Sequence, residues 1–271
     1  MVSSERSHTL GKTTAERMNA LFTPGRILVA IAMVSLGLEH LITGNFPVAL
    51  LPIPGHFPGR YVMVLTLGIV LITAGMCVGV SWKADYGAFG LGVLFGLLAL
   101  SLHVPPLLKN PSNGGAWTVF GELLAFSGGS FFAAGLLSQA GSAPSNRRFG
   151  LILAGRCLFA GALVIFGVLH FIYAHYIATL MPSWIPAPLF WAYFVGVAFL
   201  ATAVSLLINW LRTLSTGLLG LMFLLWVVVL HAPRTAKNPQ VEPEWTSLFI
   251  ALAMSGFCFL IASSARSAQT R

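Results

Sequence analysis

The sequence predicts an all-α, polytopic integral membrane protein of eight transmembrane helices, built as two parallel four-helix-bundle repeats with both termini in the cytoplasm. Three observations predict this fold: the composition, the recurrence of long apolar segments, and an internal repeat. Of the 271 residues, 57% are hydrophobic and 8% are charged, whereas a soluble globular domain has about 25% charged residues. The composition therefore excludes a water-soluble enzyme, a disordered protein and a disulfide scaffold.

Eight apolar segments are long enough to cross a bilayer, which takes about 20 residues of helix. Short polar breaks separate them. Because a segment in lipid must satisfy its own backbone polar groups, each one is expected to be a helix. The expected spans are 26–44, 61–81, 87–108, 116–138, 151–174, 190–210, 213–232 and 245–264.

The positive residues predict the orientation, because Lys and Arg collect in cytoplasmic loops. With the N-terminus inside, eleven of the fifteen Lys and Arg residues fall on the cytoplasmic side. The four on the outer side are Arg60, Lys109, Arg234 and Lys237. The sequence therefore predicts that both termini are cytoplasmic.

An internal repeat divides the chain. LHVPPLLKNP (102–111) realigns with LHAPRTAKNP (230–239) at an offset of 128 residues, and the match continues through Trp117 and Ser127. Upstream the offset is 130, which pairs Gly25 with Gly155 and Gly37 with Gly167. Since four helices are an even number, both copies are expected to cross the membrane in the same sense. The expected segments are a cytoplasmic tail (1–24), a first four-helix unit (25–138), a linker (139–149), a second four-helix unit (150–264) and a cytoplasmic tail (265–271).

The charge and the cysteines exclude two functional classes. The formal net charge of +8 follows from the cytoplasmic Lys and Arg, and no basic run with interleaved aromatic residues occurs, so nucleic-acid binding is not expected. The cysteines Cys77, Cys157 and Cys258 are far apart. Thiol–disulfide relay chemistry needs a close pair, so it is not expected either.

The histidines form the strongest candidate site. His40 and His103 of the first unit match His170 and His231 of the second, and all four fall near the outer face. Four interpretations remain open: neutral imidazoles that bond a quinone, two axial ligands of a haem in a helix bundle, a transition-metal site with a carboxylate, or interfacial histidines satisfied by loop carbonyls or water. Gly37 and Gly167, one turn before His40 and His170, would give a flat ring room to approach. The proline-rich outer segments 45–60 and 175–190 are expected to cap the two bundles.

Two carboxylates lie within the expected spans, Glu39 and Glu122. An ionisable residue inside a membrane is by default a functional candidate. Glu122 is expected at a depth similar to His103, and it is the candidate proton partner. Glu39 and His40 point about 100° apart on a helix, so one pocket is not expected to take both. The second unit has Leu169 and Ile250 at the matching positions, which assigns any carboxylate chemistry to the first unit.

The segment GVLHFIYAHYIATLMPSWIPAPLFWAYFVGVAFLATAVSLL (167–207) resembles the DoxX-like family of four-helix membrane proteins. The residues that carry the resemblance are Gly167, His170, Phe171, Pro182, Pro186, Tyr193 and Gly196, and the first unit keeps Gly37, His40, Pro52 and Gly68. Many members carry a glutamate in the second helix, where this chain has Phe199 and, in the first unit, Leu71 or one of its neighbours. The resemblance implies a membrane subunit linked to quinone or oxidase complexes.

The sequence thus predicts a redox-associated membrane subunit in the inner (plasma) membrane, holding a quinone or a haem near the outer face through His40, His103, Glu122, His170 and His231. The expected partners are the lipid bilayer and other membrane subunits, and no resident metal is expected. A non-catalytic accessory or scaffold subunit is the alternative, because the chain has little mass outside the membrane. A small-solute transporter is a third alternative, although transporter sites usually lie among polar residues at the bilayer midplane.

Overall fold

A computed structural model describes residues 2–53, 56–138 and 146–264. These residues form helices and connecting loops, and eight of the helices are long and apolar enough to cross a membrane. The protein is a multi-pass membrane protein of the all-α class, as the composition predicts. The spans are Leu21–Thr43, Arg60–Val80, Ala84–Lys109, Gly114–Leu137, Asn146–Ile172, Pro188–Ile208, Arg212–Lys237 and Glu242–Ser263.

The two halves of the chain carry the same series of elements. The first half contains α1 (Val2–Thr43), α2 (Arg60–Val80), α3 (Ala84–Leu98), the π-helix η1 (Ala99–His103), α4 (Val104–Lys109) and α5 (Gly114–Leu137). The second half contains α6 (Asn146–Ile172), α7 (Ala174–Thr179), α8 (Pro188–Ile208), α9 (Arg212–Trp226), the π-helix η2 (Val227–His231), α10 (Ala232–Lys237) and α11 (Glu242–Ser263). Among the described elements, α7 alone lacks a helical partner in the other half.

Two boundaries differ from the expected ones. The helix α1 is continuous from Val2 through Pro24, and the apolar span within it begins at Leu21, inside the expected tail 1–24. The helix α6 begins at Asn146, inside the expected linker, and its first turn contains arginines that favour a helix. The rest of that linker (139–145) and the expected C-terminal tail (265–271) lie outside the described residues.

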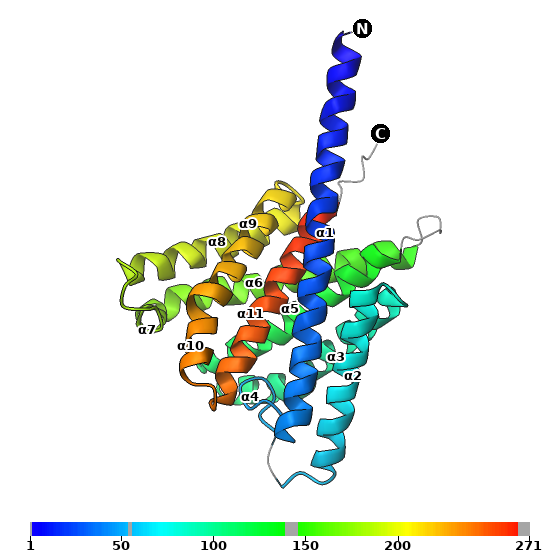
Figure 1. Ribbon diagram of the computed structural model, residues 1–271. Coiled ribbons are helices and arrows are strands. Elements are labelled where there is room, and N and C mark those ends of the chain that lie inside the picture. Colours follow the sequence, from blue (N-terminus) through cyan, green and yellow to red (C-terminus); the bar gives the residue numbers. More distant parts are fainter. Residues whose placement is uncertain (1, 54–55, 139–145, 265–271) are drawn as a thin grey trace.

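The halves interlock rather than standing side by side as two closed bundles, a point that the sequence leaves open. The first helix of each half packs against the last helix of the other half: α1 on α11, and α6 on α5. Within the described part of the chain, α1 does not contact α5, and α6 does not contact α11. The helices α5 and α11 cross at the centre of the molecule (Figure 1) and are the most buried spans. We call these contacts the α1–α11 junction and the α6–α5 junction.

Glycines set the closest approach at both junctions. A Cβ on Gly25 of α1 would lie 2.8 Å from Leu260 N and 2.9 Å from Gly256 O of α11. A Cβ on Gly155 of α6 would lie 2.5 Å from Gly128 O of α5. Small residues allow such backbone contact between membrane helices. The glycines that the repeat aligns thus meet across the two halves.

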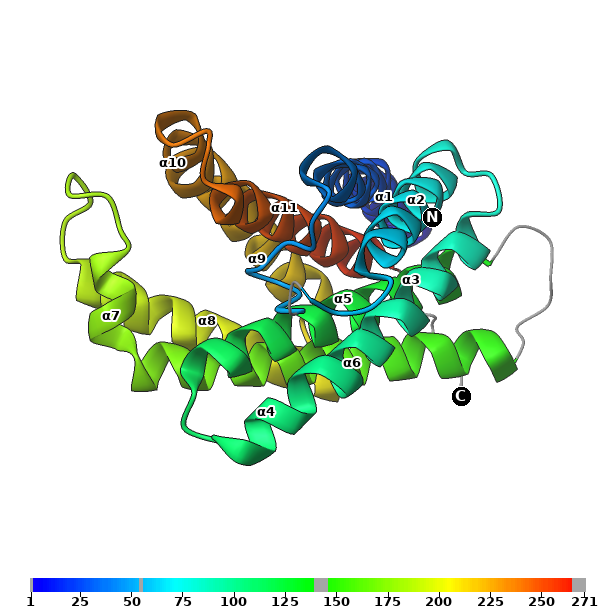
Figure 2. The ribbon, with the colours of Figure 1, turned by 90° about the horizontal axis from the view of Figure 1, so that it is seen from below.

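The third span of each half ends in a π-helical segment and a histidine. The segments η1 and η2 close with His103 and His231, and a proline follows two residues later in both. Proline lacks an N–H and interrupts the helical hydrogen bonds, and single π-turns are frequent at functional sites. We call the end of the molecule that carries His40, His103, His170 and His231 the histidine end. The short helix α7 lies there at one edge of the molecule (Figure 2).

Matched residues also make matched hydrogen bonds. The hydroxyl of Ser127 in α5 donates to Gly92 O of α3, and that of Ser255 in α11 donates to Gly220 O of α9, both at 2.8 Å. The indole N–H of Trp117 donates to Pro111 O at 2.8 Å, and that of Trp245 donates to Pro239 O at 3.0 Å. The two halves therefore share one packing scheme.

Candidate functional site

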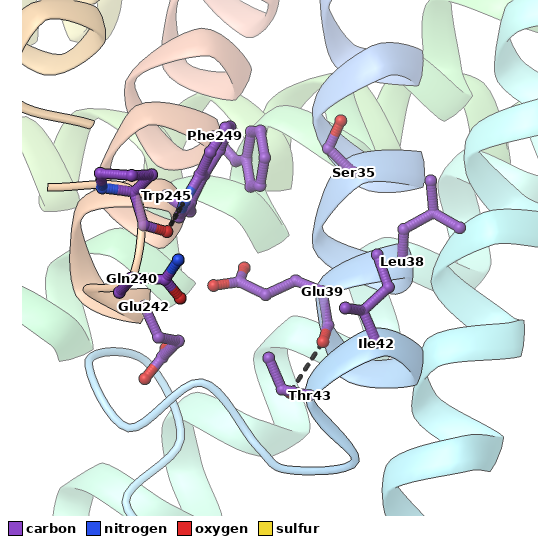
Figure 3. A pocket seen from close by; sticks show the side chains of 10 residues that line it. Ser35, Leu38, Glu39, Ile42, Thr43, Gln240, Glu242, Trp245 and Phe249 are labelled. Atoms are coloured by element: carbon purple, nitrogen blue, oxygen red, sulfur yellow. Dashed lines mark hydrogen bonds between the residues drawn. The ribbon is translucent and has the colours of Figure 1, made fainter. Parts of the chain in front are cut away.

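A pocket of about 480 Å³ lies at the histidine end of the α1–α11 junction (Figure 3). Ser35, Glu39 and Thr43 line it from α1, and Glu242, Trp245 and Phe249 line it from α11. The Glu39 side chain points from α1 across the gap towards α11. The volume falls within the range of small-molecule pockets, about 300 to 1,000 Å³.

A threonine hydroxyl joins two carboxyl groups at this pocket. The Oγ1 atom of Thr246 lies 2.6 Å from Glu39 Oε1 and 3.0 Å from Glu242 Oε1. A hydroxyl has one proton to donate, so it can donate to only one of the two carboxylates. The second contact is a hydrogen bond only when the other carboxyl carries a proton and donates to Oγ1. The shorter contact, at 2.6 Å, makes Glu39 Oε1 the acceptor of the Thr246 hydroxyl.

The second oxygen of Glu39 has no hydrogen-bond partner. Glu39 is 8% exposed, and its Oε2 atom is buried without a donor in the described residues. Buried polar groups in native proteins are nearly always hydrogen-bonded, and an exception calls for an explanation such as a ligand or an ion. Glu39 Oε2 is therefore the atom of this pocket that most needs a partner.

The outer walls of the pocket are apolar and face the lipid side. Ile42 is 81% exposed and Leu38 is 44% exposed, and both line the pocket from α1. On α11 the rings of Trp245 and Phe249 lie with their centroids 6.0 Å apart. A molecule dissolved in the bilayer could thus enter from the side and place a polar group near Glu39.

The predicted histidines point elsewhere. His40 Nδ1 bonds Leu36 O at 2.7 Å, and His170 Nδ1 bonds Phe166 O at 2.8 Å. A carbonyl only accepts, so both rings carry their proton on Nδ1 and keep a lone pair on Nε2. His40 is buried against Phe46, and His170 packs against Phe199. His40 does not line the α1–α11 pocket that Glu39 lines.

His103 and His231 end the two π-helices in different surroundings. His103 is buried, and its Nε2 atom donates to Leu50 O at 3.2 Å. A loop carbonyl as partner is what the interfacial interpretation expects. His231 is half-buried, and its Nδ1 atom has no partner in the described residues.

Glu122 is half-buried on α5, one turn from Phe126 and two turns from Gly129. Phe126 and Gly129 contact Phe257 of α11, so Glu122 shares the face of α5 that meets α11. No hydrogen bond or ring contact joins any two of His40, His103, Glu122, His170 and His231 in the described part of the chain. No group of three or more His, Cys, Asp or Glu residues suited to a metal ion occurs there either.

The glycines before the histidines do not make room for a ring. A Cβ on Gly37 would lie 2.6 Å from Gly68 O, and one on Gly167 would lie 3.1 Å from Gly196 O. These glycines bring the first and second helices of each half together, so the expectation of open space there is wrong. Glycine is found both where two helix backbones touch and where a cleft admits a ligand. The sequence alone does not distinguish these two uses.

The connections that follow α1 and α6 also differ between the two halves. In the first half, Phe46, Leu50 and Leu51 are buried over His40 and His103, as a cap would be. In the second half, Trp184 is exposed, and a second pocket of about 500 Å³ lies between the α7–α8 loop and η2–α10. The first half is capped at the histidine end, and the second half is open there.

Sequence reasoning missed Glu242 and Thr246, because it weighed Glu39 only beside its neighbour His40 and took Glu122 as the candidate carboxyl. One signal was available. Glu39 and Glu242 have Leu169 and Gly114 at their matching positions, so both carboxyls are departures from the repeat. Glu122, with Ile250 at its matching position, departs in the same way, so this signal alone does not single out the pair.

In comparison with known proteins, residues 159–264 match the model of a family described as a domain of unknown function (DUF8561). The matched segment runs from α6 to the end of α11. No match was found among curated proteins. None was found among solved structures.

Proposed function

We propose that this protein is a redox-associated membrane subunit, similar to the DoxX-like family, that holds a quinone-class lipid in the α1–α11 pocket. One observation carries the proposal: Glu39 places a buried, unpartnered carboxyl oxygen in a pocket whose outer walls face lipid. A ring with oxygen substituents on an apolar tail matches both parts of this lining. Trp245 and Phe249 supply aromatic faces for the ring.

The proposal includes the arrangement in the membrane. The chain would consist of two parallel four-helix repeats in the inner (plasma) membrane. Both termini would lie in the cytoplasm. The excess of Lys and Arg on that side supports the orientation, and the matched glycine contacts and serine hydrogen bonds support the repeat. The pocket would then open near the outer face.

The five residues predicted from the sequence are not the ligand-holding groups in this proposal. The haem hypothesis takes two of the histidines as axial ligands of one iron, whereas the His40 and His170 rings pack against Phe46 and Phe199, and His103 Nε2 donates to Leu50 O. Visible absorption spectra of the purified protein, oxidised and dithionite-reduced, are therefore expected to lack a Soret band. A variant with His103→Ala and His231→Ala is expected to keep its quinone-class ligand.

The decisive experiment fills the pocket. We expect Thr43→Tyr to place a ring in the space beside Glu39, and to reduce the binding of a short-chain benzoquinol to the protein in nanodiscs by at least about tenfold. Equilibrium dialysis measures the affinity. The matched control is Thr73→Tyr: Thr73 is exposed on α2, and like Thr43 its hydroxyl bonds the carbonyl four residues earlier.

Undiminished binding in Thr43→Tyr would contradict the proposal, and so would equal losses in both variants. If the double histidine variant lost binding while Thr43→Tyr kept it in full, the result would indicate that the ligand binds at the histidines instead.

An accessory role is the second candidate, and the exposed aromatic residues near α7 favour it. Tyr176 and Trp184 are 64% and 69% exposed at the histidine end. Exposed aromatic residues are enriched in protein interfaces as well as at the edges of membranes. Co-purification of a membrane subunit in fixed ratio, lost in a Tyr176→Ala and Trp184→Ala variant that still folds, would establish this role.

A further inference from the structure

The hydrogen-bonding groups of the α1–α11 pocket are unevenly divided between donors and acceptors, and this imbalance bears on the form of the ligand. The inference rests on the proposed function. A quinone ring offers only acceptors, its two carbonyl oxygens, whereas the reduced dihydroxy ring offers two O–H donors as well. A pocket with few free hydrogen-bond donors can therefore distinguish the dihydroxy form from the quinone.

The acceptors are the buried ones. Glu39 Oε2 is free of any donor in the described residues. The Thr246 hydroxyl is placed between Glu39 and Glu242, so its proton is committed to the carboxyl groups and does not reach a ligand. At the position of Glu39 the pocket thus presents an acceptor to whatever enters.

The donors near the pocket are mostly used. The Thr43 hydroxyl donates to Glu39 O at 2.7 Å, and the Trp245 indole N–H donates to Pro239 O at 3.0 Å. No lysine, arginine or histidine lines the pocket in the described residues. The remaining donors are the half-buried Ser35 and Gln240, which is exposed at the rim.

We infer that the pocket selects the reduced, dihydroxy form of its ring ligand, and that Glu39 Oε2 accepts a hydrogen bond from one ligand hydroxyl. With Glu39 ionised, the oxidised ring would place a carbonyl oxygen against a buried carboxylate oxygen, and neither atom can donate. Leaving such groups unpaired in a buried site costs more than a hydrogen bond gains. The same reasoning makes Glu39 a specificity-determining residue.

The test compares two ligands that differ in redox state alone. A short-chain benzoquinol and its benzoquinone, with the same tail, are titrated anaerobically into the protein in nanodiscs. The wild type is expected to bind the benzoquinol at least about tenfold more tightly, the ratio that one hydrogen bond to a charged group supplies. In Glu39→Gln, whose amide can donate, the ratio is expected to fall towards one.

The outcomes separate this inference from the proposed function. Equal affinities, or tighter binding of the benzoquinone, would overturn the redox preference and leave the quinone site in place. Absence of binding by both forms would overturn the proposed function itself. A hydrophobic tertiary amine of similar size is the third probe, and if it bound more tightly than the benzoquinol, the pocket would be a cation site and the inference would fail. The ratio of benzoquinol to benzoquinone affinity in the wild type tests the redox preference even if Glu39→Gln does not fold.

Discussion

The two junctions of this molecule share a backbone arrangement and differ at the histidine end. At both, a glycine of the first helix in one half meets a glycine of the last helix in the other half. Towards the histidine end, the α1–α11 junction has Glu39, Thr43 and Glu242. The α6–α5 junction has Leu169, Tyr173 and Gly114 at the matching positions.

The α6–α5 junction is filled by an aromatic ring. A Cβ on Gly114 would lie 2.4 Å from Tyr173 Cε2, so the ring rests directly on the glycine. The Tyr173 hydroxyl donates to Ser112 O at 2.9 Å. Thr43 is too short to reach the matching place, and the space beside it is the α1–α11 pocket.

The comparison shows that the pocket is not a consequence of the helix arrangement. The same glycine crossing supports a filled junction and an open one, and a few side chains decide between them. Polar groups occupy the open junction, whereas a ring and an aliphatic side chain occupy the closed one. Changes at matched positions can therefore separate what belongs to the packing from what belongs to the site.

The largest effect is expected at the glycine crossing of the α6–α5 junction. In Gly155→Ala the new Cβ would lie 2.4 Å from Phe132 N, a backbone atom that cannot rotate away. The helices must move apart, and overpacking of this kind costs about 1–3 kcal/mol. We expect a lower thermal unfolding midpoint in detergent. Gly90→Ala is the control, because no atom lies within 4 Å of a Cβ there; equal midpoints for the two variants would refute the close contact.

Most of the fold could be predicted from the sequence, because membrane spans depend on a local property. Eight apolar segments of sufficient length identify eight helices whatever their packing, and the observed spans overlap all eight expected ones. Helix ends were less certain. The starts of α1 and α6 extend into polar segments, where nothing in the apolar pattern marks a boundary.

The candidate site could not be predicted in the same way, because it forms between helices that are far apart in the chain. Thr246 and Glu39 are 207 residues apart, and their contact depends on which first helix packs against which last helix. The repeat makes Gly25 equivalent to Gly155 but does not say whether each meets the glycine of its own half or of the other. This also explains why the sequence favours Glu122 over Glu39. The position of a residue along its helix predicts its depth in the membrane, but not which other helices pack against it.

The next largest effect is expected from opening the α6–α5 junction. Tyr173→Thr removes the ring over Gly114 and the hydrogen bond to Ser112 O. For a half-buried aromatic residue we expect a loss of about 1–2 kcal/mol of stability, and no new benzoquinol site, because Leu169 supplies no carboxyl group. Denaturation and equilibrium dialysis check the two parts.

Adding Leu169→Glu and Gly114→Glu to Tyr173→Thr sharpens this comparison. The triple variant would carry the carboxyl groups of the α1–α11 junction in the α6–α5 junction, with Thr118 in the position of Thr246. We expect the binding stoichiometry to rise from one benzoquinol to two. A stoichiometry that stays at one in a folded triple variant would mean that these side chains do not suffice to make the site.

A smaller effect on stability is expected at the serine hydrogen bonds that the two halves share. Ser127→Ala and Ser255→Ala each remove a hydrogen bond of 2.8 Å to a helix carbonyl, Gly92 O and Gly220 O respectively. Hydrogen bonds between membrane helices contribute about 0.6 kcal/mol on average, so both variants should lose about that much in unfolding titrations. Losses that differ several-fold would show that the matched bonds do not have matched roles.

The smallest effect on stability is expected at the tryptophans that bond the turns before α5 and α11. Trp117→Phe and Trp245→Phe each remove an indole N–H bond to a proline carbonyl, and each should change the free energy of unfolding by less than about 0.5 kcal/mol, since both residues lie near the surface. Their effects on the ligand should differ. Trp245 lines the pocket beside Phe249 and Trp117 does not, so Trp245→Phe alone should weaken benzoquinol binding, by about twofold to threefold for a reduced aromatic contact. Because the hydrogen bond lost is the same in both variants, the difference between their affinities isolates the contact of the Trp245 ring with the ligand, and equal affinities would place the ligand away from the α11 wall.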